Sequence, residues 1–309
     1  MNTLAHSPGL TLVTGATGTQ GAATAHALLA SGHPVRLLVR KPETPAAQAL
    51  GMLGAELVRG EFDDRDSLIS AMRGVNAVFS VLRPDSDRSD SERRHGYALI
   101  EAARAVGVRH FVHTSVCEAG RHTHFPRWES GYWYRKYWTD KWDVEEAVRG
   151  AGFERWTILK PAFLMDNYAQ PKAATMFPHL RAGRITTALL PQTRMQLIAA
   201  DDVGAYARAA IAEPARFDRR SIGLAAEALS MPQVAEVLSR TLRKRVRAET
   251  VSPEEARTSG LAAGWVRSQE WTNEVGYRAD IEALRADGIA LTAFATWVER
   301  HAAEITIDG

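Results

Sequence analysis

The residues best suited to acid–base chemistry are Tyr137 and Lys141, which form a Tyr-x-x-x-Lys pattern. On a helix, residues four apart lie on one face, one turn from each other. A nearby ammonium lowers the pKa of a phenol, which can then exchange a proton with a carbonyl oxygen that gains or loses hydride. Ser115 ends an apolar run, and its hydroxyl could hydrogen-bond the same oxygen. We therefore expect Ser115, Tyr137 and Lys141 to be catalytic. The alternative is that Tyr137 only packs beside neighbouring tryptophans and that Ser115 caps a loop.

A second pattern, Thr-Gly-Ala-Thr-Gly-Thr-Gln-Gly at residues 14–21, suits phosphate binding. It lies between an apolar run and a helical pattern, and its glycines are three residues apart. Glycines in such a strand–turn–helix unit permit a tight turn, close approach of the backbone to a pyrophosphate, and close packing of the helix on the strand. The start of the helix adds N–H donors without intrahelical partners. The pattern predicts a dinucleotide site, and the alternative is an ordinary glycine-rich turn.

The end of the next apolar run, residues 35–39, indicates which dinucleotide would fit. A ribose with a free 2′-hydroxyl is usually held by an acidic residue about 20 residues after the glycines. Here Arg40 and Lys41 occupy that region, and no acid occurs until Glu43. Guanidinium and ammonium groups pair with a 2′-phosphate. We therefore predict NADP(H) rather than NAD(H), and the alternative is a solvated basic pair at a strand end.

These residues need a framework, and the first half of the chain provides alternating strand and helix patterns. Buried-strand patterns occupy residues 10–14, 35–39, 56–59, 75–82, 109–115 and 156–160, and helical patterns occupy 19–29, 46–53, 65–72, 91–106 and 134–149. Asp64 can cap the helix at 65–72. Such alternation predicts an α/β fold, a doubly wound parallel sheet of the Rossmann type, which binds ligands at the carboxyl ends of its strands.

Helical segments dominate after Pro161, at residues 201–212, 231–242 and 292–303. We therefore predict an NADP-binding Rossmann domain at residues 1–160, with later strands completing its sheet. A smaller, mostly helical lobe for a substrate or partner is predicted at residues 161–309.

Composition excludes several classes of function. The 309 residues include 38 basic and 36 acidic ones, a net charge of +2, so binding to nucleic acid or to a membrane surface through bulk charge is not expected. No apolar stretch approaches the ~20 residues that span a bilayer. The single cysteine, Cys117, excludes an internal disulfide and fits a reducing compartment. We expect a cytoplasmic protein without a metal centre, since His122 and His124 lack a well-spaced carboxylate partner.

The order of the motifs resembles the NmrA-like branch of the atypical short-chain dehydrogenase/reductase superfamily. The matching pieces are TGATGTQG at 14–21, VRLLVRKP at 35–42, GAELVRGEFDDRDSL at 54–68, EAARAVGVRHFVHTS at 101–115, KWDVEEAVRGAGFERWTILKPAFLMDN at 141–167 and IAADDVGAYARAAI at 198–211. The resemblance implies an NADP-binding Rossmann domain, a small C-terminal lobe, and a cleft between them for a substrate or regulator.

Carried over by position, the resemblance also assigns the cofactor contacts. It places the pyrophosphate at Gly15, Thr17, Gly18, Thr19, Gln20 and Gly21, and the 2′-phosphate at Arg40 and Lys41. The adenine falls at Glu61 and Phe62, where family members commonly carry Asp in place of Glu61. The middle of the cofactor falls at Ser80 and Val81, and the nicotinamide at Lys141, Lys160, Pro161 and Phe163.

Aromatic residues are concentrated in the segment before and within the helix that carries Tyr137. We expect three of them to contact a flat aromatic substrate by stacking, namely Trp128, Trp133 and Tyr134; core packing is the alternative. The family that the sequence resembles includes reductases of quinones and plant phenolics, and also NADP(H)-sensing regulators. The expected function is therefore NADPH-dependent hydride transfer to a small aromatic or quinone-like carbonyl or enone. The alternative is a non-enzymatic NADP(H)-sensing regulator that acts through a protein partner. Assembly into a homo-oligomer is compatible with either function.

Overall fold

The computed structural model describes residues 9–83 and 90–308. The chain forms two compact units, each built from several segments. Unit 1 comprises Met1–Gly120, Lys136–Lys160 and Val203–Ile222, and unit 2 comprises Arg121–Arg135, Pro161–Asp202 and Gly223–Gly309. Each unit draws on segments from both sides of residue 160, and a domain boundary at that residue stays a prediction.

Unit 1 is built on a seven-stranded sheet with the order β10-β6-β5-β4-β1-β2-β3. Its strands are β1 (Thr11–Val13), β2 (Val35–Val39), β3 (Glu56–Arg59), β4 (Ala77–Val81), β5 (His110–Thr114), β6 (Arg155–Pro161) and β10 (Arg220–Leu224). All pairings between β3 and β6 are parallel. β1 pairs with β2 on one side and β4 on the other, so the strand order reverses there. Ligands of such sheets bind at this reversal.

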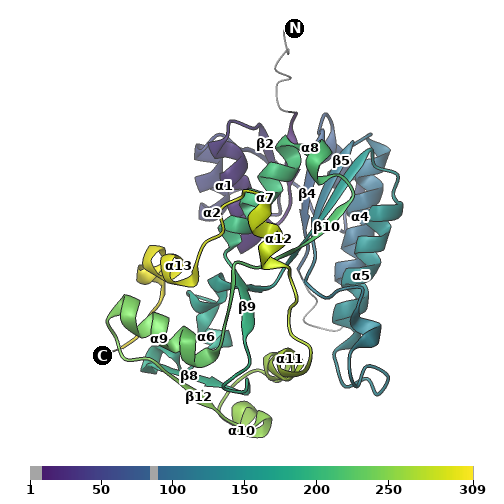
Figure 1. The fold of residues 1–309 in the computed structure, drawn as a ribbon. Coiled ribbons are helices and arrows are strands. Elements are labelled where there is room, and N and C mark those ends of the chain that lie inside the picture. The colour runs from purple at the N-terminus through teal and green to yellow at the C-terminus, as the bar shows by residue number, and fades with distance from the viewer. Residues whose placement is uncertain (1–8, 84–89, 309) are drawn as a thin grey trace. The chain divides into compact units, whose positions relative to one another are not determined.

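Helices cover both faces of this sheet, which confirms the predicted doubly wound Rossmann fold (Figure 1). They are α1 (Thr19–Ala30), α2 (Pro45–Met52), α3 (Arg65–Met72), α4 (Ser91–Ala105), α5 (Arg135–Gly150), α7 (Ala200–Ala212) and α8 (Pro214–Phe217). On one face, α3, α4 and α5 bury a common apolar core that includes Leu68, Leu99, Phe111 and Val144. As predicted, Asp64 caps α3, because its carboxylate accepts a hydrogen bond from the Ser67 N–H at 3.0 Å.

Unit 2 contains many helices and two small sheets. The helices are α6 (Ala173–Met176), α9 (Met231–Leu242), α10 (Pro253–Thr258), α11 (Ala263–Glu274), α12 (Ile281–Ala286) and α13 (Phe294–Arg300). One sheet has the order β11-β9-β7 and the other pairs β12 with β8. These strands are β7 (Phe163–Leu164), β8 (Arg184–Thr187), β9 (Met195–Ile198), β11 (Glu227–Leu229) and β12 (Arg247–Thr250). They have only two to four residues, too few for a visible alternation of apolar and polar residues.

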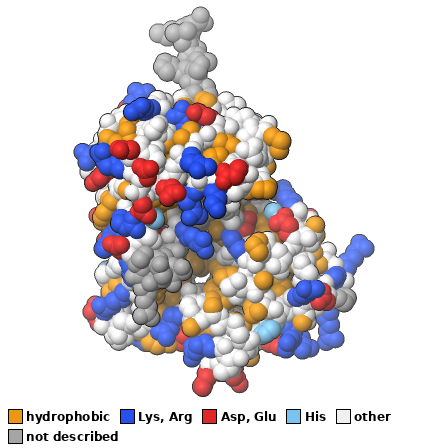
Figure 2. Space-filling view, turned by 180° about the vertical axis from the view of Figure 1, so that it is seen from behind, with side chains coloured by type: hydrophobic (Ala, Val, Ile, Leu, Met, Phe, Trp, Pro, Cys, Tyr) orange, Lys and Arg blue, Asp and Glu red, His pale blue; other side chains and the backbone are white. Residues whose placement is uncertain are grey.

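Short 3₁₀ helices complete the secondary structure: η1 (His122–His124), η2 (Met165–Tyr168), η3 (Leu180–Ala182) and η4 (Ala302–Glu304). Acidic and basic side chains are intermixed over the face of the molecule drawn in Figure 2, as the near-balance of charge leads one to expect. Among the described residues, no helix is both long enough and apolar enough to cross a membrane. The same residues contain no group of three or more His, Cys, Asp or Glu side chains placed to bind a metal ion.

Candidate functional site

The glycine-rich turn joins β1 to α1 and packs directly against β4. Gly15 has a positive φ of 60°, and a Cβ built there would lie 2.6 Å from Cγ1 of Val81. A Cβ on Gly21 would lie 2.2 Å from the carbonyl oxygen of Gly15. The Thr14 hydroxyl fixes the start of the turn, since it accepts from the Val81 N–H at 2.9 Å and donates to the Val81 carbonyl at 3.1 Å. Larger residues at 15 and 21 would therefore displace the turn.

The first turn of α1 is suited to an anion. Gly18 is its N-cap residue, no side chain caps it, and no acidic residue lies in the first turn. Gly15, Thr17 and Gly18 are exposed, whereas Thr19 and Gln20 are half-buried. The side-chain oxygen of Gln20 is buried without a hydrogen-bond partner among the described residues. Because the first N–H groups of a helix have no intrahelical partner, this exposed turn fits a pyrophosphate.

Two basic residues follow β2, beside the turn. The register pairs Val13 of β1 with Leu37 of β2, so Arg40 lies just past the same sheet edge as the glycines. The side chains of Arg40 and Lys41 are exposed, and within residues 9–83 and 90–308 neither is hydrogen-bonded or paired with a carboxylate. The nearest acid in sequence, Glu43, pairs instead with Arg59 at 3.5 Å. Both basic groups are thus available to an anionic ligand.

The residues predicted to border the adenine and the middle of the cofactor follow β3 and lie in β4. Glu61 is exposed, and its backbone N–H donates to the Ser67 hydroxyl at 3.1 Å. The ring of Phe62 stacks on His95 with ring centres 5.1 Å apart. Ser80 is buried and its hydroxyl lies 3.1 Å from Nδ1 of His113, so its oxygen already has a partner. These contacts with a cofactor stay predictions.

The predicted catalytic residues all belong to unit 1. Tyr137 and Lys141 lie one turn apart on α5, and the Lys141 ammonium is 5.1 Å from the centre of the Tyr137 ring. The same ammonium lies 2.7 Å from Oε1 of Glu92 on α4, and both side chains of this ion pair are buried. Ser115 follows β5, and its buried hydroxyl has no hydrogen-bond partner in the part of the chain that the structure describes. An unsatisfied buried hydroxyl at a strand end is suited to bind a ligand.

The pKa of Tyr137 is raised, whereas the sequence analysis expects a pKa lowered by the Lys141 ammonium. Burial raises the pKa of Tyr137, and the charges of Glu92 and Cys117 raise it further. Burial of the phenol is the main cause. The Glu92 carboxylate adds to it, and Glu92 also pairs with the ammonium that was expected to lower the pKa of the phenol. Sequence reasoning missed Glu92, since it belongs to a different helix and no local pattern links it to Lys141.

His113 is a second buried titratable residue that sequence reasoning left without a role in the site. Burial lowers its pKa to about 3, and the nearby Lys141 ammonium acts in the same direction. The imidazole is therefore neutral at physiological pH. It accepts from or donates to the Ser80 hydroxyl, depending on its tautomer.

Lys160 has structural partners in unit 1. Its ammonium donates to the Ala119 carbonyl at 2.6 Å and pairs with Glu145 of α5 at 3.2 Å. The Cys117 thiol donates to the Lys160 carbonyl at 2.8 Å, and Cys117 is buried. The charge of Lys160 thus serves to hold α5 against β6. Pro161 and Phe163 belong to unit 2, where the Phe163 ring stacks on Trp265 at 5.2 Å, and their contact with the nicotinamide stays a prediction.

The aromatic segment before α5 belongs to unit 2 and packs against α11. Trp128 and Trp133 are buried, and the Trp133 indole donates to the Pro126 carbonyl. The burial of these two rings agrees with the alternative that they pack in a core. Tyr134 is 44% exposed, and a substrate contact of all three residues stays a prediction.

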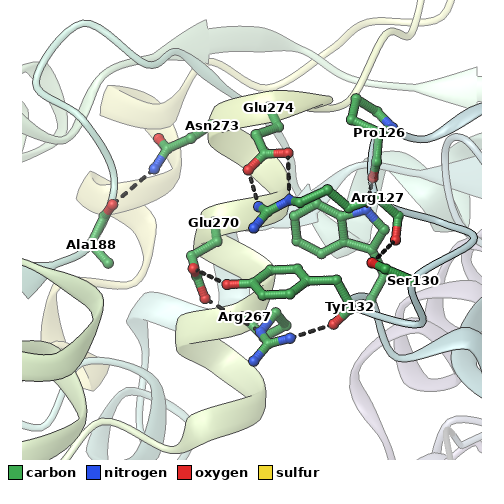
Figure 3. A network of polar contacts seen from close by, with 10 residues as sticks. Pro126, Arg127, Ser130, Tyr132, Ala188, Arg267, Glu270, Asn273 and Glu274 are labelled. Carbon is green, nitrogen blue, oxygen red and sulfur yellow. Dashed lines mark hydrogen bonds and ion pairs between the residues drawn. The ribbon is translucent and has the colours of Figure 1, made fainter.

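Tyr132, to which the sequence analysis gives no role, anchors this segment (Figure 3). Its ring lies between two guanidinium groups, that of Arg127 at 3.6 Å and that of Arg267 at 3.8 Å. Its hydroxyl donates to Glu270 at 2.5 Å, and Arg127 pairs with Glu274. The sequence shows that aromatic residues are concentrated here, but it does not show that charged side chains of α11 contact this segment.

The NmrA-like family matches residues 9–297. A (4-alkanoyl-5-oxo-2,5-dihydrofuran-3-yl)methyl phosphate reductase from Streptomyces griseus is 33% identical over 251 residues, which cover 81% of this chain and 80% of that protein.

Two solved structures share the fold. An NADPH-dependent quinone oxidoreductase from Escherichia coli, complexed with NADPH, has a TM-score of 0.74 and 23% identity, and the match covers 94% of this chain and 99% of that one. NmrA, a negative transcriptional regulator in complex with NADP, has a TM-score of 0.75 and 20% identity, with 97% of each chain covered. The match over nearly the whole chain and the similarity to the reductase together establish that this protein belongs to the NmrA-like family.

Proposed function

We propose that this protein is an NADP(H)-dependent reductase that transfers hydride to a small aromatic or quinone-like carbonyl or enone. The observation that carries the proposal is the exposed, uncapped turn at the start of α1 beside Arg40 and Lys41, whose exposed side chains pair with no carboxylate of residues 9–83 and 90–308. The names of the related reductase and of the quinone oxidoreductase with the same fold support the reaction class.

In this proposal the dinucleotide lies along the carboxyl edge of the unit 1 sheet. The backbone at residues 15–21 and the start of α1 hold its pyrophosphate. Arg40 and Lys41 pair with the 2′-phosphate, which NADH lacks. An ammonium has three N–H donors, so the ion pair with Glu92 leaves Lys141 able to donate to a cofactor hydroxyl as well.

Bound NADPH would supply the hydride, and the protein would manage the proton. As hydride reaches a carbonyl carbon, negative charge develops on the oxygen. Tyr137 keeps its hydroxyl proton, because burial and Glu92 keep the pKa of the phenol high, and it can donate this proton to the carbonyl oxygen. The Ser115 hydroxyl, which has no hydrogen-bond partner among the described residues, can donate a hydrogen bond to the same oxygen. The tyrosinate that remains regains its proton from solvent.

The test starts with binding. NADPH and NADH are titrated into wild-type protein, and we expect tighter binding of NADPH. Arg40→Ala should weaken the binding of NADPH by roughly 10- to 100-fold, which corresponds to the loss of one charge-assisted hydrogen bond. The affinity for NADH should stay nearly unchanged. Arg104→Ala is the matched control, since Arg104 is exposed in the last turn of α4 and the helix ends on the opposite edge of the sheet. Equal affinity for the two cofactors would contradict the assignment of Arg40.

Turnover is then measured as NADPH oxidation with a panel of quinones and aromatic enones, for wild type and Tyr137→Phe. We expect turnover with at least one quinone and a loss of roughly 10²–10⁴-fold in kcat in the variant. The alternative is an NADP(H)-sensing regulator. NmrA, a regulator with bound NADP, and the quinone oxidoreductase both have this fold, so the fold does not separate the two functions. Binding of NADPH without turnover over the whole panel would support that alternative and reject the reductase.

A further inference from the structure

A buried carboxylate lies next to the proposed proton donor. Glu92 is in the first turn of α4 and is 4% exposed. A carboxylate in such a position needs a partner, because burial of an unpaired charge is strongly unfavourable. Its partner is the Lys141 ammonium on α5, at 2.7 Å, and the two side chains are 5% and 7% exposed. The ion pair therefore links two neighbouring helices of unit 1 in the interior.

The ion pair is also part of the surroundings of Tyr137. The Lys141 ammonium lies 5.1 Å from the centre of the phenol ring, so carboxylate, ammonium and ring form one cluster. Among the described residues, the titratable groups that act on this cluster include Glu92 from α4, Lys141 from α5, and His113 and Cys117 from β5 and the segment after it; Arg149 of α5 acts on His113. His113 is neutral, and the Cys117 thiol donates to a backbone carbonyl. Glu92 and Lys141 therefore provide opposite charges beside the phenol.

We propose that Glu92 is a positioning residue of the site: its carboxylate anchors the Lys141 ammonium below the Tyr137 ring, neutralises it there, and keeps Tyr137 in the hydroxyl form that donates a proton. The inference rests on the proposed function and deepens it. An ammonium alone beside a phenol favours the phenolate, which can only accept a proton. Burial of the phenol is the largest cause of its raised pKa, and the Glu92 charge raises the pKa further, so the phenol keeps its proton. Hydride and this proton then convert a carbonyl to an alcohol, so Glu92 favours reduction.

The first test titrates Tyr137 itself and needs no turnover. Tyrosinate formation is followed by ultraviolet difference absorbance, and the signal of Tyr137 is obtained by subtracting a Tyr137→Phe variant made in the same background. In Glu92→Gln we expect the titration midpoint of Tyr137 to fall by roughly one pH unit or more, because the ammonium is no longer neutralised. Asp143→Asn is the matched control. Asp143 also joins α5 to α4, through Arg93 at 3.2 Å, but both side chains are partly exposed. The titration midpoint of Tyr137 in Asp143→Asn should equal that in wild type.

The second test uses the pH dependence of kcat with a quinone and NADPH. Proton donation ends when the phenol loses its proton, so the alkaline decline in kcat should begin at lower pH in Glu92→Gln than in wild type. A merely structural role would lower kcat by the same factor at every pH. An unchanged Tyr137 midpoint in folded Glu92→Gln overturns the inference about Glu92.

Failure of the two proposals can be told apart. Absence of NADPH binding or of turnover rejects the reductase, whereas the titration of Tyr137 still decides whether Glu92 controls the phenol. If Glu92→Gln does not fold, Glu92→Asp decides, because aspartate keeps the charge but withdraws it from Lys141. We then expect a smaller fall of the midpoint, and a lower melting temperature with no fall in the midpoint overturns the inference.

Discussion

Single atoms limit which residues the turn between β1 and α1 can contain. Gly21 is the sharpest case, because a Cβ there would meet the Gly15 carbonyl oxygen at 2.2 Å and the Thr14 carbonyl oxygen at 2.7 Å. Both obstacles are backbone atoms, which cannot rotate away as a side chain can. The helix packs this closely on the strand because glycine has no side chain, and close packing brings the helix start to the phosphate-binding position.

We therefore expect Gly21→Ala to lower the free energy of unfolding by about 1–3 kcal/mol and to weaken NADPH binding. Denaturant unfolding and NADPH titration check this. Gly150→Ala is the control, since no atom of the described part of the chain lies within 4 Å of a Cβ built at that helix end. There, alanine should be neutral or stabilise by about 0.5–1 kcal/mol. Equal stability of the two variants would show that the turn relaxes without cost.

His113 makes stability depend on pH, and the sign follows from its lowered pKa. Folding moves the pKa of its imidazole from 6.5 to about 3. Above pH 6.5 the imidazole is neutral in both states. Below pH 6.5 the unfolded chain binds a proton that the folded protein does not bind until about pH 3, so stability falls as pH falls through this window. The loss is at most about 1.4 kcal/mol per pH unit for this residue.

His113→Gln keeps a hydrogen-bonding group for Ser80 and removes the titration. Unfolding free energies at pH 7.5 and pH 5 should therefore differ less in this variant than in wild type. Some loss should remain, because burial also lowers the pKa of His110, to about 4. An equal loss in wild type and His113→Gln would assign the pH dependence to other groups.

At the scale of elements, buried ion pairs fix how α5 lies on the unit 1 sheet. Glu145 of α5 is fully buried, pairs with Lys160 of β6 at 3.2 Å, and pairs with Arg149 at 2.8 Å. Glu92 and Lys141 join α5 to α4. The helix that carries Tyr137 is thus held on two sides by ion pairs whose carboxylates are buried.

Glu145→Ala should lower the free energy of unfolding by about 3–5 kcal/mol, because it removes a fully buried carboxylate and leaves the mostly buried Lys160 ammonium without its acidic partner. Glu146→Ala is the control. It removes the neighbouring carboxylate, which pairs with the same Arg149 but is 53% exposed, and should change stability by less than about 1 kcal/mol. Urea unfolding of the two variants gives the comparison. Similar losses would mean that solvent reaches the Glu145 pair.

At the scale of the whole molecule, the chain passes from one unit to the other several times. Residues 121–135 leave unit 1 between β5 and α5, and residues 203–222 return to it. A ligand that binds the folded protein but not the unfolded chain stabilises it by mass action. The sheet of unit 1 contains strands from both halves of the sequence, so stabilisation by a cofactor reaches the C-terminal half as well.

NADPH at 100 times its dissociation constant should therefore stabilise the protein by about 2.7 kcal/mol, and NADH at the same concentration by less. Melting temperatures with each cofactor measure the difference. Arg40→Ala should reduce the shift with NADPH to that with NADH. A wild-type melting temperature that neither cofactor raises would argue against a dinucleotide site in this protein.

The sequence by itself determined the features that depend on short-range spacing. The glycines at 15, 18 and 21, the alternating strands and helices, and the basic residues after residue 39 each lie within one βαβ unit, where chain geometry fixes their relation. The tertiary structure alone decided the partners of the buried charges. Glu92 lies 49 residues from Lys141, and Ser80 lies 33 from His113, so no local pattern joins them. It also decided the sign of the pKa shift of Tyr137, because burial and the neutralised ammonium depend on how α4, α5 and β5 pack together.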